Sequence, residues 1–429
     1  MTDSTAMPIT LDLLKKFVKG DAVAIRGTAT LEPAGGPGDK VFPPTHSVPK
    51  GETRYAFEKR RIDGRDVECV LIDSVQSQAN RMEEALEVLW SNRQIRLPVV
   101  SVDFSGVAPD VGVVTSLTAP HRVADALLRD SLDNSGMLFR LTEIGRSFTD
   151  ATAKNAGALF KVCPTGLVFG LWDSTGPKGG LGSKFSRTLV SEIVGMGAVA
   201  GSKTASRIDP ASIITSAGPV FVAKEPGTDG KPTWTLSVMD AKPLKVDKPP
   251  KDDKDIDAVE KWGKKEKAGK PTSINHSNIP PTIDSTAGGV TIDYASHTVV
   301  LSLAALRKLS FGDGDIEART VLAALAVLAV IAAENRGHDL RSRCLLIPKK
   351  DAALKLEAVC RNGTTQPLSI DLEGAIDLFN AAVKGLPPAL QFTNKAGEPL
   401  ATLTPSPKLA HLVRRSRELA ATGAEIEAD

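Results

Sequence analysis

The residues with the clearest capacity for chemistry lie in a basic, glycine-rich segment in the middle of the chain. An apolar run over residues 167–172 ends at Asp173, and a helix is expected from Thr188 to Val194. Between them lie four glycines, two lysines and an arginine, namely Gly176, Gly179, Gly180, Gly182, Lys178, Lys184 and Arg187. Glycine lets backbone N–H groups approach a ligand closely, and neighbouring cations favour an anion. A buried strand leading through such a loop into a helix is typical of phosphate binding.

The spacing excludes the common nucleotide-binding loops. The order at residues 182–184 is Gly-Ser-Lys, whereas a Walker A motif ends in Gly-Lys-Ser or Gly-Lys-Thr. There is also no G-x-G-x-x-G in a βαβ context, so neither a mononucleotide nor a dinucleotide pocket is supported. Two interpretations of the segment remain open. It contacts a phosphate backbone, or it is a surface loop whose basic residues serve only solubility, because glycine clusters most often form loops.

Charge is distributed unevenly along the 429 residues. The whole chain has a net charge of only +2, but residues 140–207 contain nine Lys or Arg and four Asp or Glu, a local charge of +5. A basic segment within a near-neutral protein indicates a localised contact with a polyanion rather than a general polycation.

Cysteine and histidine usage predicts neither metal nor redox chemistry. The four cysteines (Cys69, Cys163, Cys344 and Cys360) are far apart and form no C-x-x-C pair, which argues against a zinc site and a disulfide framework. The six histidines are scattered and suggest no Ser/His/Asp set. The N-terminus is no signal peptide, and the apolar stretch 321–333 is too short to span a bilayer. We expect a cytoplasmic protein with no membrane partner, cofactor or metal.

A second group of candidate residues follows a predicted hairpin. Residues 54–62 and 65–73 flank Asp63-Gly64, the dipeptide that a type I′ turn prefers. The second strand leads into a helix expected over 77–90, with Ser77 as its N-cap. Six polar side chains crowd this helix start: Ser74, Gln76, Ser77, Gln78, Asn80 and Arg81. Capping needs one or two of them, so a ligand surface is favoured.

The order strand, helix, strand occurs twice, which predicts an α+β fold. The first set is 67–73, 77–90 and a following strand, and the second is 298–305, 315–335 and 341–347. Two such units fold as a split βαβ, the ferredoxin-like or RRM arrangement. The RRM's own RNA signature is absent and aromatic residues make up only 4% of the chain. If the protein binds RNA, contact with the backbone is therefore favoured over stacking of bases.

Composition sets the expected domain boundaries. Residues 242–270 contain ten Lys and seven Asp or Glu with almost nothing apolar, which indicates a solvated linker or insertion. We therefore expect the first half of an RRM-like palm with finger and thumb insertions over 1–240, a flexible charged linker or insertion over 241–285, the second half of the palm over 286–400, and a C-terminal tail or helix over 401–429.

Two long motifs carry a family resemblance. They are VLIDSVQSQANRMEE at residues 70–84 and GLWDSTGPKGGLGSKFSR at residues 170–187. Together they resemble the RAMP-type backbone subunit of type I-G (formerly I-U) CRISPR Cascade effector complexes, also called the GSU-type CRISPR-associated protein. The resemblance runs from about residue 10 to 385, and residues 242–270 match poorly.

The resemblance implies a hand-shaped fold with an RRM-like palm, and a role in antiviral defence without catalytic residues. Several copies of such a subunit bind the phosphate backbone of one CRISPR guide RNA and present its bases to target DNA. The implied partners are further copies of the chain, the large subunit, the subunit that caps or processes the guide end, and a recruited helicase-nuclease. The alternative is a metal-dependent ribonuclease of the RAMP superfamily that cleaves guide-paired RNA. Asp73 and Asp103 are its candidate carboxylates, and the resemblance places neither of them in that role.

The same resemblance places two segments at the RNA. Residues 77–81 match the helix start that faces RNA in the family, and residues 176–187 match its glycine-basic motif. The full set of expected RNA-binding residues is Arg26, Ser74, Gln76, Ser77, Gln78, Asn80, Arg81, Arg146, Lys154, Lys178, Gly179, Gly180, Ser183, Lys184 and Arg187.

Overall fold

The chain divides into two compact units, each of which is described by itself. The computed structural model describes residues 6–176, 183–228, 230–245, 247–263 and 267–421. Unit 1 comprises Met1–Ala200 and Gly289–Arg414, and unit 2 comprises Gly201–Gly288 and Arg415–Asp429. Both motifs of the sequence lie in unit 1.

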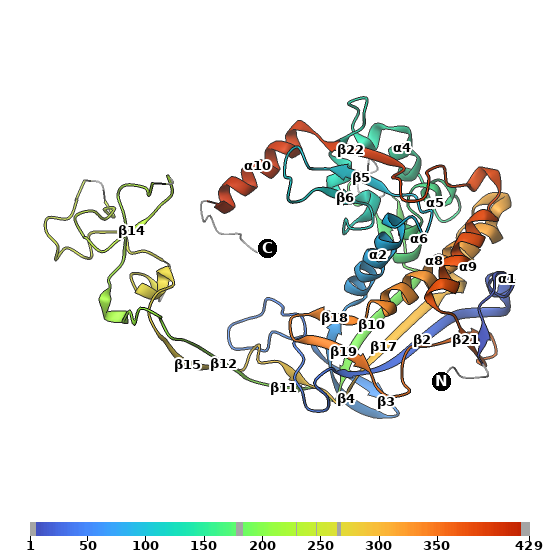
Figure 1. Cartoon of the computed structure of the whole chain (residues 1–429), viewed down its shortest axis with the longest axis horizontal. Helices are drawn as coiled ribbons and strands as arrows, with labels where there is room; N and C mark the ends of the chain where they lie inside the picture. Colours follow the sequence, from blue (N-terminus) through green and yellow to red (C-terminus); the bar gives the residue numbers. More distant parts are fainter. Residues whose placement is uncertain (1–5, 177–182, 229, 246, 264–266, 422–429) are drawn as a thin grey trace. The chain divides into compact units, whose positions relative to one another are not determined.

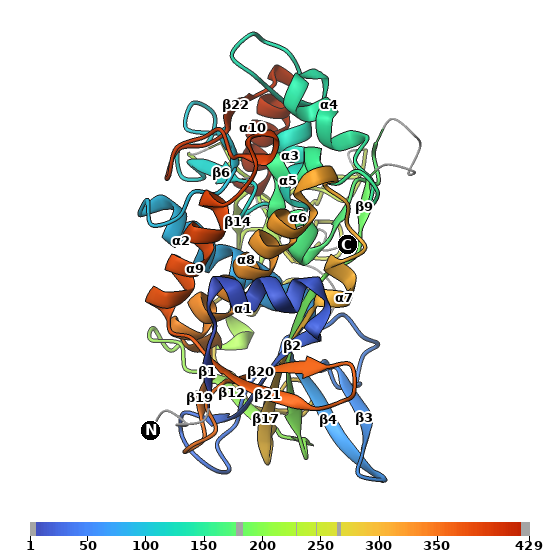
Figure 2. The same cartoon turned by 90° about the vertical axis from the view of Figure 1, so that its right-hand side faces the viewer.

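Unit 1 is an α+β structure built on a ten-stranded sheet (Figures 1 and 2). The strand order is β1-β21-β20-β2-β17-β10-β4-β3, and a hairpin of β18 and β19 joins it through β2. Every pairing is antiparallel except that of β1 with β21. The strands are β1 (Met7–Pro8), β2 (Ala22–Pro33), β3 (Phe57–Ile62), β4 (Arg65–Asp73), β10 (Leu189–Met196), β17 (Tyr294–Ser302), β18 (His338–Arg341), β19 (Cys344–Pro348), β20 (Lys355–Cys360) and β21 (Thr365–Ser369).

The central strands have one buried and one partly open face. In β17, Ala295, Val299 and Leu301 are buried, whereas Thr298 and Val300 between them are half-exposed. Such alternation is the period of two of a strand packed on one side. Helices cover the buried face (Figures 1 and 2). They are α1 (Leu11–Lys16), α2 (Val75–Ser91), α7 (Leu303–Leu306), α8 (Asp315–Asn335) and α9 (Leu372–Lys384).

Helix α8 is the centre of the main core. Its residues from Val321 to Val330 are all buried, which explains why its sequence is apolar almost all round. One helix in the described residues, Gly312–Asn335, is apolar and long enough to cross a membrane by length and composition alone. Core helices of soluble proteins pass the same test, and 72% of this apolar window is buried, so the finding is weak evidence for a membrane span.

A smaller four-stranded sheet and several short helices complete unit 1. The sheet order is β6-β5-β22-β7, and β5 pairs with β22 in parallel. The sheet strands are β5 (Val100–Asp103), β6 (Val113–Thr115), β7 (Ser131–Leu132) and β22 (Ala401–Pro405), and the short helices are α3 (Ala126–Arg129), α4 (Glu143–Thr149), α5 (Gly157–Val162) and α6 (Pro164–Phe169). Two separate strand pairs are β8 (Leu171–Trp172) with β9 (Lys184–Phe185) and β11 (Val199–Ala200) with β16 (Val290–Thr291). Helix α10 (Pro407–Ala421) begins in unit 1, and its residues from Arg415 onward belong to unit 2.

Unit 2 has little regular structure. A ladder of β12 (Lys203–Arg207) with β15 (Ile279–Asp284) and a small ladder of β13 (Phe221–Val222) with β14 (Trp234–Thr235) are its strands in the described residues. In its described residues, one small apolar cluster contains four buried side chains: Phe221, Val238, Ala241 and Val259.

Several predicted elements are confirmed. The hairpin is β3 and β4, and its turn holds Asp63 at φ 47° and Gly64 at φ 76°, the positive values that a type I′ turn requires. The predicted helix over 315–335 is α8. The single strand expected over 341–347 is instead the hairpin of β18 and β19.

Two predictions around the glycine-rich segment are wrong. The apolar run expected to be a strand begins as helix α6 (Pro164–Phe169), and only Leu171–Trp172 is extended. The helix expected from Thr188 is strand β10, which lies between β17 and β4 in the main sheet. Alternate residues of β10 starting at Leu189 are buried, so its period of two places it in the sheet. The segment therefore does not lead into a helix N-terminus, and that argument for phosphate binding is lost.

Candidate nucleic-acid interface

Asp73 is the centre of a buried polar cluster at the start of α2. Its side chain is fully buried, and its two carboxylate oxygens accept hydrogen bonds from four side chains. The donors are Ser77 Oγ (2.9 Å), Gln78 Nε2 (2.7 Å), Arg81 Nε (3.0 Å) and Arg341 Nη2 (2.8 Å). We call these five residues the Asp73 cluster. Two guanidinium groups thus pair with this buried carboxylate, as a charged group removed from water requires.

The helix start differs from the prediction at its cap. Ser74, not Ser77, is the N-cap of α2, and its Oγ accepts a hydrogen bond from the Ser77 amide at 3.2 Å. Ser77 and Gln78 use their side chains inside the cluster, and Gln78 is buried. Gln76 and Asn80 are exposed, so of the six polar residues predicted here these two are the most accessible to a ligand.

The described part of the glycine-rich segment is fixed to α4 by one serine. Ser183 is buried, and its hydroxyl lies 2.6 Å, 3.0 Å and 3.1 Å from the carbonyl oxygens of Phe148, Thr149 and Ala151. Its role in the structure is therefore to hold the segment in place rather than to present a hydroxyl. The predicted residues Lys178, Gly179 and Gly180 lie outside the described residues.

Four predicted cations form what we call the basic rim: Arg146, Lys154, Lys184 and Arg187. All four are exposed, and none forms an ion pair within the described residues. Ser183 is hydrogen-bonded to the C-terminal end of α4, the helix that carries Arg146. Its neighbour Lys184 therefore lies close to the end of α4, and Lys154 is in the loop that follows this helix. The Lys184 ammonium lies 5.4 Å from the centre of the Trp172 ring, which is itself 58% exposed.

The two motifs of the sequence are joined by a buried arginine that sequence reasoning missed. Arg122 Nε and Nη2 each lie 2.7 Å from an oxygen of Glu83 on α2, and Arg122 Nη1 donates to the carbonyl of Gly170 at 3.0 Å. Gly170 has φ 90°, which favours glycine at this turn between α6 and β8. Burial raises the pKa of Glu83 to about 7, although the Arg122 guanidinium acts to lower it. The pair ties α2 to the start of the second motif.

Arg26 lies apart from both groups, on the open face of the main sheet. Its Nε donates to Glu357 Oε1 at 2.7 Å, across the pairing of β2 with β20. Its charge is therefore neutralised in part. The neighbouring central positions on this face are Thr28, Thr298, Val300 and Val190, with no aromatic ring among them.

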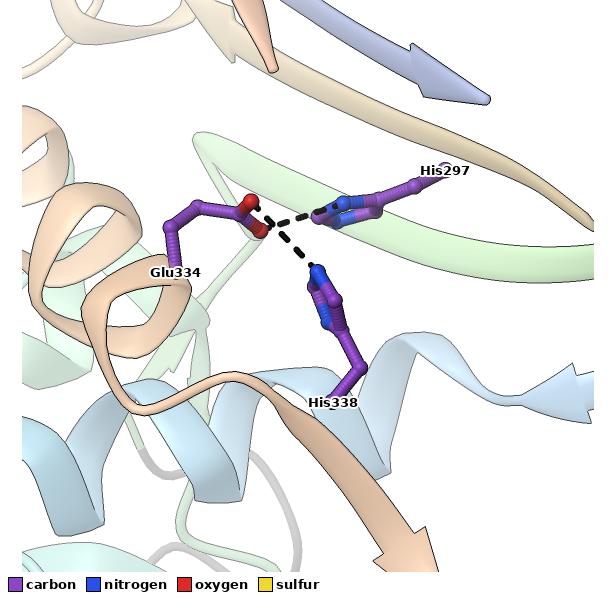
Figure 3. A group of neighbouring side chains, drawn as sticks. All are labelled: His297, Glu334 and His338. Carbon is purple, nitrogen blue, oxygen red and sulfur yellow. Dashed lines mark ion pairs between the residues drawn. The ribbon is translucent and has the colours of Figure 1, made fainter. Parts of the chain in front are cut away.

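A third group was not predicted at all. His297 on β17, Glu334 on α8 and His338 on β18 point toward one another (Figure 3), with candidate ligand atoms all within 4.8 Å. Only the spacing of Glu334 and His338, four residues apart, is visible in the sequence. The group contacts the Asp73 cluster indirectly: Ser191 Oγ lies 2.9 Å from both His297 Nε2 and Gln78 Oε1.

The described residues therefore offer exposed cations beside a support that is held by buried polar contacts. Residues 25–200 match the family model of the CRISPR-associated protein GSU0053. The match includes both motifs, the Asp73 cluster except Arg341, and the basic rim. It covers less than half of the chain and supports a CRISPR-associated (Cas) protein. No match to the chain was found among curated proteins.

Proposed function

We propose that this protein is a non-catalytic backbone subunit that binds a CRISPR guide RNA in a type I-G Cascade complex. Several copies assemble along one guide and present its bases to target DNA. The observation that carries this proposal is the basic rim, four exposed cations with no ion pair in the described residues, inside the region that matches a CRISPR-associated family. Exposed cations held beside a rigid scaffold suit a phosphate backbone of any sequence.

The sheet topology supports an RRM-like palm for this subunit. The four strands β20-β2-β17-β10 are neighbours in that order and pair antiparallel. Helix α2 lies between β2 and β10 in sequence, and α8 lies between β17 and β20. This is the strand order of a split βαβ fold. The first unit is thus β2-α2-β10, not the predicted 67–73 and 77–90 with a following strand, because β4 belongs to the hairpin inserted after β2.

The insertions fit the finger and thumb of the proposed hand. The β3–β4 hairpin interrupts the chain between β2 and α2, and unit 2 interrupts it between β10 and β17. The absence of rings at the named central positions of the open face favours contact with phosphate and ribose over stacking of bases. Sequence specificity then comes from base pairing by the guide.

The proposed partners follow from this role. They are the guide RNA, target DNA through the guide, further copies of this chain, the large subunit, the subunit that caps or processes the guide end, and a recruited helicase-nuclease. The proposed location is the cytoplasm.

Reversing the charge of the rim is expected to weaken RNA retention without unfolding the subunit. In Lys184→Glu and Arg187→Glu, the slope of the logarithm of the RNA association constant against the logarithm of the salt concentration is expected to fall in magnitude by about 1 per lost contact. The reason is that each phosphate contact releases counterions. The subunit is expressed with a CRISPR array and partner subunits, and bound RNA is quantified over a range of salt. The loss should be equal for different spacer sequences.

Lys395→Glu is the matched control, because Lys395 is an exposed lysine of unit 1 that already faces Glu398 at 3.9 Å. Wild-type RNA occupancy in both rim variants, or an equal loss in the Lys395 variant, contradicts the rim as the contact surface. Absence of RNA from the wild-type assembly contradicts the proposed function itself.

Incubation of the assembled complex with complementary RNA and Mg²⁺ is expected to yield no cleavage. The ribonuclease alternative requires an open carboxylate for the metal, and both oxygens of Asp73 already accept hydrogen bonds from arginine side chains. The Asp103 side chain accepts from the Ser105 amide at 2.8 Å, an ordinary turn contact. Cleavage that is lost in Asp103→Asn or Asp73→Asn is the result that favours the alternative.

A further inference from the structure

The group of His297, Glu334 and His338 lies where three elements of unit 1 meet (Figure 3). Glu334 is in the last turn of α8, His338 begins β18 four residues later, and His297 lies mid-way along β17. The side chain of Glu334 is 18% exposed, that of His338 is 8% exposed, and that of His297 is 2% exposed. A carboxylate and two imidazoles are thus brought together in a mostly buried position by elements far apart in the sequence.

The hydrogen bonds around His297 leave one ring nitrogen aimed into this group. The Ser191 hydroxyl donates to Gln78 Oε1, so its oxygen is free to accept from His297 Nε2–H, 2.9 Å away. The other nitrogen, Nδ1, is buried and makes no hydrogen bond to any described residue, although it lies 3.2 Å from Glu334 Oε1. Nδ1 and Glu334 Oε1 therefore face each other at a separation that either a proton or a metal ion between them would satisfy.

The distances suit a small tetrahedral cation. Bonds of ~2.0–2.1 Å from zinc to nitrogen and oxygen ligands put neighbouring ligand atoms about 3.3 Å apart in a tetrahedron. Glu334 Oε1 lies 3.2 Å from His297 Nδ1, and Glu334 Oε2 lies 3.5 Å from His338 Nε2, so each imidazole faces its own carboxylate oxygen.

The group is also accessible from outside. Glu334 and His338 line a pocket of about 200 Å³ together with Gln78, Arg81 and Glu84. The charges of the other pocket walls balance, since Arg81 and Arg336 oppose Glu84 and Asp339. The pocket gives a cation a route to Glu334 and His338, and His297 lies behind them, 2% exposed.

We propose that His297 Nδ1, Glu334 and His338 Nε2 form a binding site for a divalent transition metal ion, of which Zn²⁺ is the first probe. Two imidazoles and one carboxylate favour zinc and its neighbours over the oxygen-seeking Mg²⁺. Ser191 holds His297 in the required tautomer, as the outer partners of metal-binding histidines commonly do. The bound ion joins β17, α8 and β18, and lies next to the Asp73 cluster through Ser191 and Gln78. This proposal does not depend on RNA binding.

The test is calorimetric titration of the tag-free full chain with Zn²⁺ after dialysis against a chelator, with Mg²⁺ as the comparison ion. We expect one Zn²⁺ per chain, no comparable binding of Mg²⁺, and a rise in unfolding temperature with Zn²⁺. Glu334→Gln and His338→Gln should each weaken the Kd for Zn²⁺ at least tenfold. Both positions are less buried than His297, so these variants are the ones expected to fold.

His411→Gln is the matched control, because His411 is an exposed histidine of unit 1. It should bind Zn²⁺ as the wild type does. X-ray absorption of the Zn²⁺ complex should show nitrogen and oxygen ligands, including two imidazoles. No stoichiometric uptake of Zn²⁺, or uptake that the Glu334 and His338 variants retain in full, overturns the proposal and leaves the group as an ion-paired structural cluster.

Discussion

Glu83→Ala is expected to lower the free energy of unfolding by about 3–5 kcal/mol, because it leaves the buried guanidinium of Arg122 without its partner. The pair is almost completely enclosed, with Arg122 8% and Glu83 2% exposed. The arginine then retains the carbonyl of Gly170 and the ring of Phe169, 5.5 Å from its guanidinium carbon, and neither neutralises its charge. Chemical denaturation at pH 8, above the raised pKa of Glu83, measures the loss.

The neighbouring residue supplies the control for this prediction. Glu84 lies on the same helix but is exposed, so Glu84→Ala should change the free energy of unfolding by less than about 1 kcal/mol. A double variant that replaces both Glu83 and Arg122 with apolar residues of similar volume should recover part of the loss. Wild-type stability in Glu83→Ala would show that the two motifs do not depend on this pair.

Asp73→Ala is the second substitution from which we expect a large effect. It should lower both the free energy of unfolding and the retention of RNA. The substitution leaves Arg81 and Arg341 facing each other without the carboxylate, and we expect a loss of about 3–5 kcal/mol in the free energy of unfolding. Asp73→Asn keeps the shape and loses only the charge, so it should be the milder of the two. Under the proposed function, the start of α2 then loses its fixed position, and RNA retention should fall with stability.

Asp66→Ala is the control for Asp73, because Asp66 lies in the same strand but is 60% exposed in its pair with Arg61. Its effect should stay below about 1 kcal/mol. If Asp73→Ala folds with wild-type stability yet loses RNA, Asp73 acts on RNA directly and the cluster is not the scaffold described above.

Local chemistry explains which elements were predictable. A type I′ turn requires positive φ at both central residues, and Asp63-Gly64 is a dipeptide that favours such values. The hairpin could therefore be predicted from these two residues. The apolar stretch around Val321 to Val330 leaves no polar face, so α8 was visible as a central helix. By contrast, Leu189–Met196 has few local signals, and its structure is set by β17 and β4, which lie far away in the sequence. A helix was therefore predicted where tertiary pairing imposes a strand.

The residues of the candidate site also fall into those that local sequence could predict and those that it could not. Ser77, Gln78 and Arg81 were named because they lie within five positions of one another, but Arg341 joins them from a strand that no spacing rule connects to α2. Arg122 was missed because a buried ion pair has no local pattern. His297 was missed because its partners are on α8 and β18, and only folding brings the three together.

The charged edge strand β3 sets a limit on how copies of this chain can join. Its central residues are Glu58, Lys59, Arg60 and Arg61, and the strand at the other end of the sheet, β1, is only two residues long. Neither end offers a long apolar template, and charged or very short edges block strand-to-strand aggregation. Strand-to-strand joining at these two ends of the sheet is therefore disfavoured. Under the proposed function, copies along one guide RNA would contact one another through other surfaces.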